Sequence, residues 1–286
     1  MILKPLSLDI SLPNQDNQND IEFDITECLV DPNEEVAEPT PIIAFEHNGY
    51  TVPIFTENNK SLIKGQAKSR KSTLIKAIGA TIVSKGYFSE GGKLKSYYDR
   101  NELSIIDTEQ GKYHCYKAVK MIQRLSGESI NYYRVAGKTI PQKKYLVEQH
   151  LKTHPNCGVM VIDNIVHFLL DFNSATESRE LESWIDYLVE TYNCHIILVL
   201  HENGSDSGLG KAKGHLGSLL ENTCETTIRV RKDPDNKGQS IVSGALTRNG
   251  DFEDFIISMD YQGVPYISVP SDGKPIHKTI KLFKGL

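Results

Sequence analysis

Residues 65–73 read Gly-Gln-Ala-Lys-Ser-Arg-Lys-Ser-Thr. The stretch matches the phosphate-binding pattern G-x-x-x-x-G-K-[S/T], except that Arg70 replaces the last glycine. Such a loop turns backbone N–H groups inward as an anion nest, and its lysine and hydroxyl serve the outer phosphates and Mg²⁺ at a helix start. A basic surface turn is the alternative. We predict a nucleotide-binding loop made of Gly65, Gln66, Ala67, Lys68, Ser69, Arg70, Lys71, Ser72 and Thr73.

The residues on either side of the loop fit this interpretation. Before it, Ser61-Leu62-Ile63-Lys64 is a short apolar stretch that predicts a strand. After it, apolar residues recur at helical spacing up to an expected stop at Gly86, namely Leu74, Ile75, Ala77, Ile78 and Ile82. Strand, glycine turn, Lys-Ser and helix follow one another as a phosphate-binding loop requires.

Further along the chain, strand patterns alternate with helix patterns. We expect strands at 103–107, 130–135, 159–163 and 195–200, and helices at 113–125, 142–153 and 177–192. This alternation indicates a mostly parallel sheet with helices on both faces. The strands near residues 160 and 197 are almost continuously apolar, as central parallel strands are.

The two ends of the folded region have a different pattern. Two strand-like segments within 42–55 flank Asn48-Gly49, which predicts a hairpin. A short helix is expected at 215–225. After it, turns separate strand-like segments at 226–231, 240–246, 255–259 and 266–269. We therefore predict an α/β fold whose central sheet finishes with antiparallel strands at its C-terminal end.

The overall composition is that of a soluble protein. Of 286 residues, 39% are hydrophobic and 24% charged, and no apolar run approaches the roughly 20 residues that span a bilayer. The first residues, Met-Ile-Leu-Lys-Pro, lack the design of a signal peptide. The five cysteines are scattered, without a C-x-x-C pair, which suits a reducing compartment. We expect a cytoplasmic protein without a membrane partner.

Charge divides the chain unevenly. Residues 1–40 hold ten acidic side chains and one lysine, a net charge of −9, which leaves 41–286 at +4 within a total of −5. We therefore predict an acidic, disordered arm over 1–40, a folded domain over 41–270 and a basic tail over 271–286. We expect the arm to be a solvated tail; the alternative is an arm that binds a partner or competes with nucleic acid for a basic channel.

Two expected strands end in acidic residues. Val159-Met-Val-Ile-Asp163 is an apolar strand whose aspartate is placed to orient Mg²⁺, with the cap of a following helix as the alternative. Ile105-Ile106-Asp107-Thr108-Glu109 is the second such strand. Nucleotide hydrolysis needs a group that orients the attacking water, and Glu109 is our candidate. A strand-to-helix turn capped by Asp107 is the alternative.

The order of these motifs resembles that of a RecA-type ATPase, of the branch that includes the plasmid RepA hexameric helicases. The similarity spans roughly residues 42–270. It is carried by the loop at 65–73, the strand ending at Glu109, the strand ending at Asp163, and Leu198-Val-Leu-His201 with Lys213-Gly-His-Leu-Gly-Ser218 after it. The resemblance implies a RecA-like P-loop NTPase core that binds ATP and Mg²⁺.

The resemblance also implies roles for single residues. Lys71 contacts the β- and γ-phosphates, Ser72 and Asp163 hold Mg²⁺, Glu109 is the catalytic glutamate and His201 senses the γ-phosphate. More loosely, Arg248 lies where related hexamers carry an arginine that enters the neighbouring subunit's site. An exposed turn arginine beside Asn249-Gly250 is the alternative for Arg248.

A glycine-rich loop at 203–214 follows the strand of His201. In the family the corresponding loop faces a central channel and touches DNA. The resemblance therefore implies that Lys211 and Lys213 contact single-stranded DNA. The loop has no aromatic residue for base stacking, and a mobile surface loop is the alternative. The leading hypothesis is a ring-forming, hexameric ATPase that acts on DNA, as a helicase or a replication or mobilisation protein of a mobile element.

Arg70 favours a second hypothesis. The last glycine of the loop sits beside the phosphates, where a side chain can crowd them, although Arg70 and Lys68 also add positive charge there. The chain would then be a nucleotide-dependent regulator or adaptor that binds ATP or ADP and hydrolyses it slowly or not at all.

Overall fold

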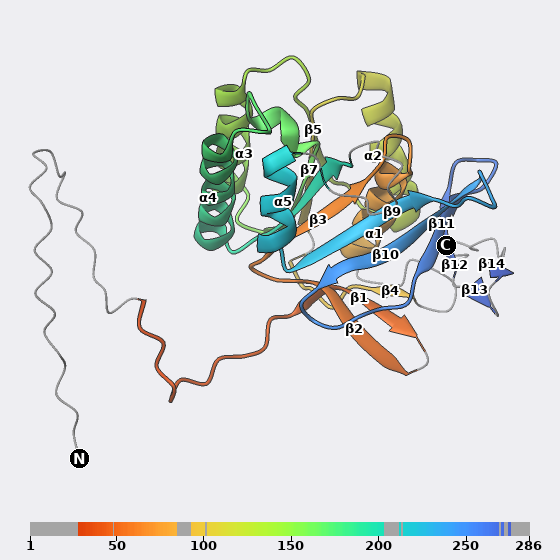
Figure 1. Cartoon of the computed structure of the whole chain (residues 1–286), viewed down its shortest axis with the longest axis horizontal. Helices are drawn as coiled ribbons and strands as arrows, with labels where there is room; N and C mark the ends of the chain where they lie inside the picture. The colour runs from red at the N-terminus through yellow and green to blue at the C-terminus, as the bar shows by residue number, and fades with distance from the viewer. Residues whose placement is uncertain are drawn as a thin grey trace, which may run out of the picture. The chain divides into compact units, whose positions relative to one another are not determined.

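A nine-stranded sheet lies at the centre of the fold (Figure 1). The computed structural model describes residues 28–47, 49–84, 93–100, 102–202, 212, 214–268, 270–271 and 274–275. Residue contacts divide the chain into two units, Met1–Glu38 and Pro39–Leu286. In the first unit, the described residues 28–38 are exposed throughout. The strands and the helices α1 to α5 belong to the second unit.

The sheet has the strand order β12-β11-β10-β9-β3-β8-β7-β5-β6. The six strands from β9 to β6 are parallel, and β10, β11 and β12 continue the sheet in antiparallel pairing. The strand bounds are β3 (Lys60–Gly65), β5 (Glu102–Asp107), β6 (Asn131–Arg134), β7 (Cys157–Asp163), β8 (His195–His201), β9 (Thr226–Lys232), β10 (Gln239–Thr247), β11 (Phe255–Met259) and β12 (Pro265–Ser268).

Apolar side chains cover both faces of the parallel strands. In β3, the fully buried Leu62 joins the core on one face and its neighbour Ile63 the core on the other. Ile162 and Val161 of β7 divide in the same way. A strand buried on both faces cannot alternate polar and apolar residues, which is why these segments are continuously apolar in sequence.

Two layers of helices enclose the sheet. α1 (Lys71–Ser84) and α2 (Lys112–Ser126) contribute to the core on one face. On the other face lie α3 (Ile140–Thr153), α4 (Ala175–Tyr192) and α5 (Gly214–Thr223) (Figure 1). The N-cap side chain of α3, Thr139, accepts a hydrogen bond from the backbone N–H of Gln142, whose side chain in turn accepts from the Thr139 backbone. This capping box satisfies N–H groups that the first turn of a helix leaves without partners.

A second sheet packs beside α1. β1 (Pro41–His47) pairs in antiparallel fashion with β2 (Tyr50–Thr56) and with the short β4 (Leu94–Lys95), in the order β2-β1-β4. Ile42 and Phe55 of this sheet are fully buried in the same core as α1. The predicted hairpin thus forms a layer of its own, with Asn48 of its turn outside the described residues.

Most of the fold prediction is confirmed. The fold is α/β, its central sheet is mostly parallel with helices on both faces, and antiparallel strands finish it towards the C-terminus. The sequence did not predict β4, the 3₁₀ turn η2 (Ile165–Phe168) or the short hairpin of β13 (Pro270–Ser271) and β14 (Lys274–Pro275). Among the described residues, no helix is long and apolar enough to cross a membrane. The proposed boundaries of arm, domain and tail stay predictions.

Candidate nucleotide site

The polar residues expected at the strand ends meet at one edge of the sheet. Gly65 at the end of β3 pairs with His201 at the end of β8. Asp163 at the end of β7 pairs with Val199 of β8 and with Asp107 at the end of β5. Neighbouring parallel strands bring their carboxyl ends to the same edge, which is where α/β sheets bind ligands.

The loop after β3 is tightly packed at both ends. A Cβ atom added to Gly65 would lie 2.1 Å from the carbonyl oxygen of Val230, so only glycine fits at this position. At the other end, Lys71 is the first residue of α1 and is buried. Its Nζ donates to the carbonyl oxygens of Gly65 at 2.7 Å and Gln66 at 3.0 Å, and lies 3.0 Å from Nδ1 of His201. The lysine therefore spans the inside of the loop.

Arg70 keeps the backbone shape that a glycine would give. Its φ is +69°, in the left-handed region that glycine occupies without strain. The guanidinium donates to the carbonyl oxygens of Lys237 at 2.8 Å and Gln239 at 3.0 Å, and to Oγ of Ser240 at 3.1 Å. These partners lie at the start of β10 and in the turn before it. The side chain is therefore held by the chain's own C-terminal strands.

Glu109 is surrounded by hydrogen-bond donors. Its Oε1 accepts from Nδ2 of Asn164 at 3.1 Å and lies 3.0 Å from Nε2 of His167, while Oε2 lies 3.7 Å from Nε2 of His201. These contacts, with His201 contributing most to the shift, lower the pKa of Glu109 to about 2 although its partial burial acts in the opposite direction. Glu109 is therefore a carboxylate at neutral pH.

Asp107 organises the turn that carries Glu109. Its carboxylate accepts hydrogen bonds from the backbone N–H groups of Glu109 at 3.0 Å and Gln110 at 2.8 Å, and from the hydroxyl of Tyr132 at 2.6 Å. Asp107 is 1% exposed. Burial and the adjacent Asp107 raise the pKa of Tyr132, so its hydroxyl stays a donor. The predicted cap at Asp107 and the predicted role of Glu109 are therefore compatible.

The pKa values of Asp163 and Lys71 are both shifted towards the uncharged form of the side chain. Burial and the nearby carboxylates of Asp107 and Glu109 raise the pKa of Asp163 to about 6. Burial also lowers the pKa of Lys71 to about 8, although Asp163 and Glu109 act against that shift. Both shifts mean that charged side chains are held where water is scarce. A bound cation would favour the charged form of Asp163, and a bound phosphate that of Lys71.

A cavity of about 250 Å³ joins these groups. Its lining comprises loop residues 68–72 together with Asp107, Glu109, Gln110, Asp163 and His201. Oxygen donors predominate on one side of it, which suits a hard dication such as Mg²⁺. Three of the lining side chains are carboxylates, those of Asp107, Glu109 and Asp163. The residues present therefore fit the ion that the sequence implied.

The structure brings together most of the predicted site residues. Lys71, Ser72, Glu109, Asp163 and His201 all line the cavity. Arg248 lies elsewhere, because its backbone N–H donates to Glu225, whose own N–H donates to Lys60 at the opposite end of β3. Its side chain is exposed. Lys211 and Lys213 lie outside the described residues.

Two residues that hold Glu109 were missed by sequence reasoning. Neither Asn164 nor His167 was among the predicted site residues. Asn164 is the N-cap of η2, and its Oδ1 accepts from the N–H of Val166 at 3.2 Å. The 3₁₀ turn folds the chain back so that His167 faces Glu109. An asparagine directly after the strand, which favours such a cap, was the available signal.

Comparison with known proteins supports the fold only. No family model matches the chain, and no curated protein matches it either. Among solved structures, it is similar to the crystal structure of the RadB recombinase, with a TM-score of 0.52 over 76% of this chain and 93% of that one. The fold is RecA-like. Sequence identity is 15%, so the similarity says nothing of the activity.

Proposed function

We propose that this protein is an ATPase that binds ATP with Mg²⁺ between the loop at 65–73 and the ends of β5, β7 and β8. The observation that carries the proposal is the convergence of Lys71, Glu109, Asp163 and His201 on one cavity. These residues come from four segments far apart in sequence. A basic surface turn would explain the loop but not the three polar strand ends that face it.

Each residue has a role that follows from its position. Lys71 and the backbone N–H groups at the start of α1 would hold the outer phosphates. Ser72 and Asp163 would hold Mg²⁺, whose positive charge offsets that of the phosphate oxygens. His201, 3.0 Å from Lys71 Nζ, is placed to contact the γ-phosphate. Phosphoryl transfer needs positioning and charge stabilisation more than covalent help from the protein.

Glu109 would orient the attacking water. A general base works best with a pKa near the operating pH, and that of Glu109 is about 2. The carboxylate is therefore suited to accept a hydrogen bond from water and fix its direction, while the proton ends on the released phosphate. Asn164 and His167 keep the carboxylate in place.

The sharpest test replaces Glu109 by glutamine. Glu109→Gln keeps the size of the side chain and its contacts with Asn164, but it replaces one acceptor oxygen by a donor. We expect hydrolysis of ATP to fall by about 10²-fold or more while binding of a fluorescent ATP analogue is retained. Glu128→Gln, on the exposed segment after α2, is the matched control and should hydrolyse ATP at the wild-type rate. Unchanged turnover in Glu109→Gln would refute the role of this residue.

We further propose that the ATPase acts on single-stranded DNA as a ring of subunits, with a helicase-like or mobilisation role on a mobile element. The structural relative is described as a recombinase. Residues 41–286 carry a net charge of +4, and the expected loop with Lys211 and Lys213 follows the strand of His201. Turnover should therefore rise when single-stranded DNA is added.

A nucleotide-dependent regulator is the second candidate. The anchoring of Arg70 on β10 favours it, because three hydrogen bonds hold the loop in one shape and couple it to the C-terminal strands. Such a protein would bind ATP tightly and hydrolyse it slowly, with or without DNA. Strong stimulation by DNA would contradict this candidate, and tight binding without turnover would contradict the motor.

A further inference from the structure

A group of side chains of the types that bind metal ions lies at the other end of β5. One ligand atom from each of Glu102, His150 and His154 lies within 4.8 Å of the other two. Glu102 is the first residue of β5, whereas Asp107 of the nucleotide site is the last. Asp107 lies five residue steps along the strand from Glu102, a distance of about 17 Å. The group is therefore distinct from the nucleotide site, and the proposed function does not use it.

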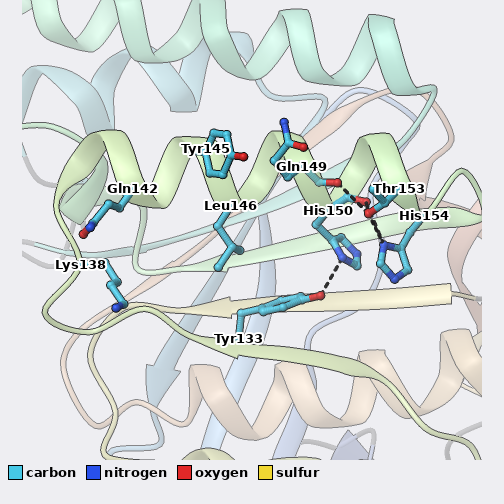
Figure 2. A pocket seen from close by; sticks show the side chains of 9 residues that line it. All are labelled: Tyr133, Lys138, Gln142, Tyr145, Leu146, Gln149, His150, Thr153 and His154. Atoms are coloured by element: carbon cyan, nitrogen blue, oxygen red, sulfur yellow. Dashed lines mark hydrogen bonds between the residues drawn. The ribbon is translucent and has the colours of Figure 1, made fainter.

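The hydrogen bonds of His154 leave one ring nitrogen free to bind a metal. Nδ1 lies 3.0 Å from the carbonyl oxygen of His150, one turn earlier in the chain. A carbonyl oxygen only accepts, so Nδ1 carries the proton and Nε2 keeps its lone pair. Metal-binding histidines are commonly oriented in this way, through a carbonyl bound to the other nitrogen. Figure 2 shows the ring beside that of His150, under the last turn of α3.

His150 is oriented by a different partner. Its Nδ1 lies 2.9 Å from the hydroxyl of Tyr133 on β6, as Figure 2 shows, and its Nε2 contacts the hydroxyl of Ser104 on β5. Ser104 and Glu102 lie two residues apart, so they face the same side of the strand. Nε2 of His150 therefore points to the face that carries the carboxylate. An ion at Nε2 would replace this hydrogen bond to Ser104, whose oxygen also accepts from Sγ of Cys157 at 3.4 Å.

The protonation states suit a metal ion. Burial lowers the pKa of His150 to about 4, so the ring is neutral and keeps a lone pair at pH 7. Burial raises the pKa of Cys157 to about 11, which keeps it a thiol and argues against it as a ligand. Nδ2 of Asn131 donates to Oε1 of Glu102 at 2.8 Å and fixes the carboxylate. Each of the three candidate ligands thus has an outer partner that orients it.

We propose that Glu102, His150 and His154 bind one transition-metal dication of the zinc class. Two imidazoles and a carboxylate form a ligand set that zinc accepts, with a further position left for water. The ion would tie the end of α3 to the start of β5. It has a way in, because His150 and His154 line an open pocket of about 450 Å³ beneath α3 (Figure 2). Tight packing of two histidines without a metal is the competing explanation.

The test measures zinc binding to the full chain. Metal-free wild type, His154→Ala and Glu102→Gln are titrated with Zn²⁺ against a chromogenic zinc chelator, with excess Mg²⁺ and a reductant that does not bind zinc. We expect the wild type to bind one more zinc ion than His154→Ala, or to bind it at least about tenfold more tightly, since loss of even an outer partner costs that much. Zn²⁺ should also raise the melting temperature of the wild type and not that of His154→Ala.

Two controls keep the outcome decisive. His114→Ala removes an exposed histidine from α2 and should bind zinc as the wild type does. Glu102→Gln keeps the shape of the side chain, so its loss of zinc cannot be attributed to misfolding of α3. Co²⁺ in place of Zn²⁺ should give a visible absorption band in the wild type that both ligand variants weaken. Equal zinc content and affinity in the wild type and both ligand variants would overturn the proposal, and would leave the histidine pair a packing contact.

Discussion

At the scale of the residue, the nucleotide site contains two carboxylates whose surroundings act in opposite directions. Three donors surround Glu109 and lower its pKa to about 2. Asp163 is close to two other carboxylates and is poor in solvent, and its pKa rises to about 6. The pKa values of these two carboxyl groups thus differ because their neighbouring residues differ. Glu109 is therefore charged over a wider range of pH than Asp163.

The raised pKa of Asp163 predicts a dependence of stability on pH. Because the folded pKa of about 6 exceeds the ordinary value of 3.8, the folded protein binds more protons between these values. The contribution of Asp163 to the free energy of unfolding therefore falls as pH rises from about 4 to about 6. Asn does not titrate, so Asp163→Asn removes this decrease in the free energy of unfolding. The substitution should stabilise the Mg²⁺-free protein by up to about 3 kcal/mol at pH 7.

Urea unfolding of Asp163→Asn and wild type at pH 4.5, 5.5 and 7.5 checks this expectation. The quantity to follow is the difference between the two proteins, because burial lowers the pKa of both His150 and His195 to about 4 and gives the wild type an opposite trend. The exposed Asp235→Asn supplies the effect of an amide replacement alone. A difference that stays constant over the three pH values would show that Asp163 does not titrate in this window.

At the scale of the element, the loop at 65–73 is shaped from both sides. Gly65 allows close contact with β9, where the carbonyl oxygen of Val230 leaves no room for a Cβ atom. Arg70 adopts a left-handed backbone and anchors the loop on the start of β10. The broken sequence pattern therefore replaces a flexible residue by one that is strained but anchored.

Replacing Arg70 by alanine and by glycine separates strain from anchoring. Both substitutions remove the hydrogen bonds to Lys237, Gln239 and Ser240. Alanine keeps the cost of the left-handed backbone and glycine does not, so Arg70→Gly should be the more stable of the two by about 1 kcal/mol in urea unfolding. At Arg179, an exposed position inside α4, the order should reverse, because glycine weakens a helix. The same order at both positions would refute the interpretation of Arg70.

The elements themselves were largely predictable, and so was the edge at which the site forms. The elements were predictable because apolar periodicity is a local property of the sequence. The edge was predictable because parallel strands in βαβ alternation end at one edge of the sheet, and Asp163, His201 and Glu109 all lie at or just after strand ends. The remaining features depend on contacts that sequence patterns do not encode. The partners of Arg70 lie more than 160 positions further along the chain, and His167 reaches Glu109 only through a 3₁₀ turn. The proximity of Glu102 on β5 to His150 and His154 at the end of α3 is likewise a contact between distant segments, which local sequence patterns do not reveal.

At the scale of the whole molecule, the position of Arg248 limits where it can act. The backbone of Arg248 is hydrogen-bonded to Glu225, whose own N–H donates to Lys60 at the start of β3, while the loop follows the end of that strand, about 17 Å away. The side chain is exposed and starts from the opposite end of β3 to its own candidate nucleotide site. If it contributes to hydrolysis, it does so in a neighbouring subunit, as the sequence hypothesis supposed.

Mixing two inactive variants tests this arrangement. Arg248→Ala should lose about 10³-fold in ATP turnover, the usual effect of an arginine that stabilises transition-state charge, yet its own site keeps Glu109. Glu109→Gln keeps Arg248 and offers it to a neighbour. Equal amounts of the two, after subunit exchange, should regain roughly a quarter of wild-type turnover, because in a random ring a quarter of the sites combine an intact glutamate with a neighbour's arginine.

Lys71→Ala mixed with Glu109→Gln should regain nothing, since both residues belong to the same chain's site. If the first mixture is no more active than its separate components, Arg248 does not complete a neighbour's site.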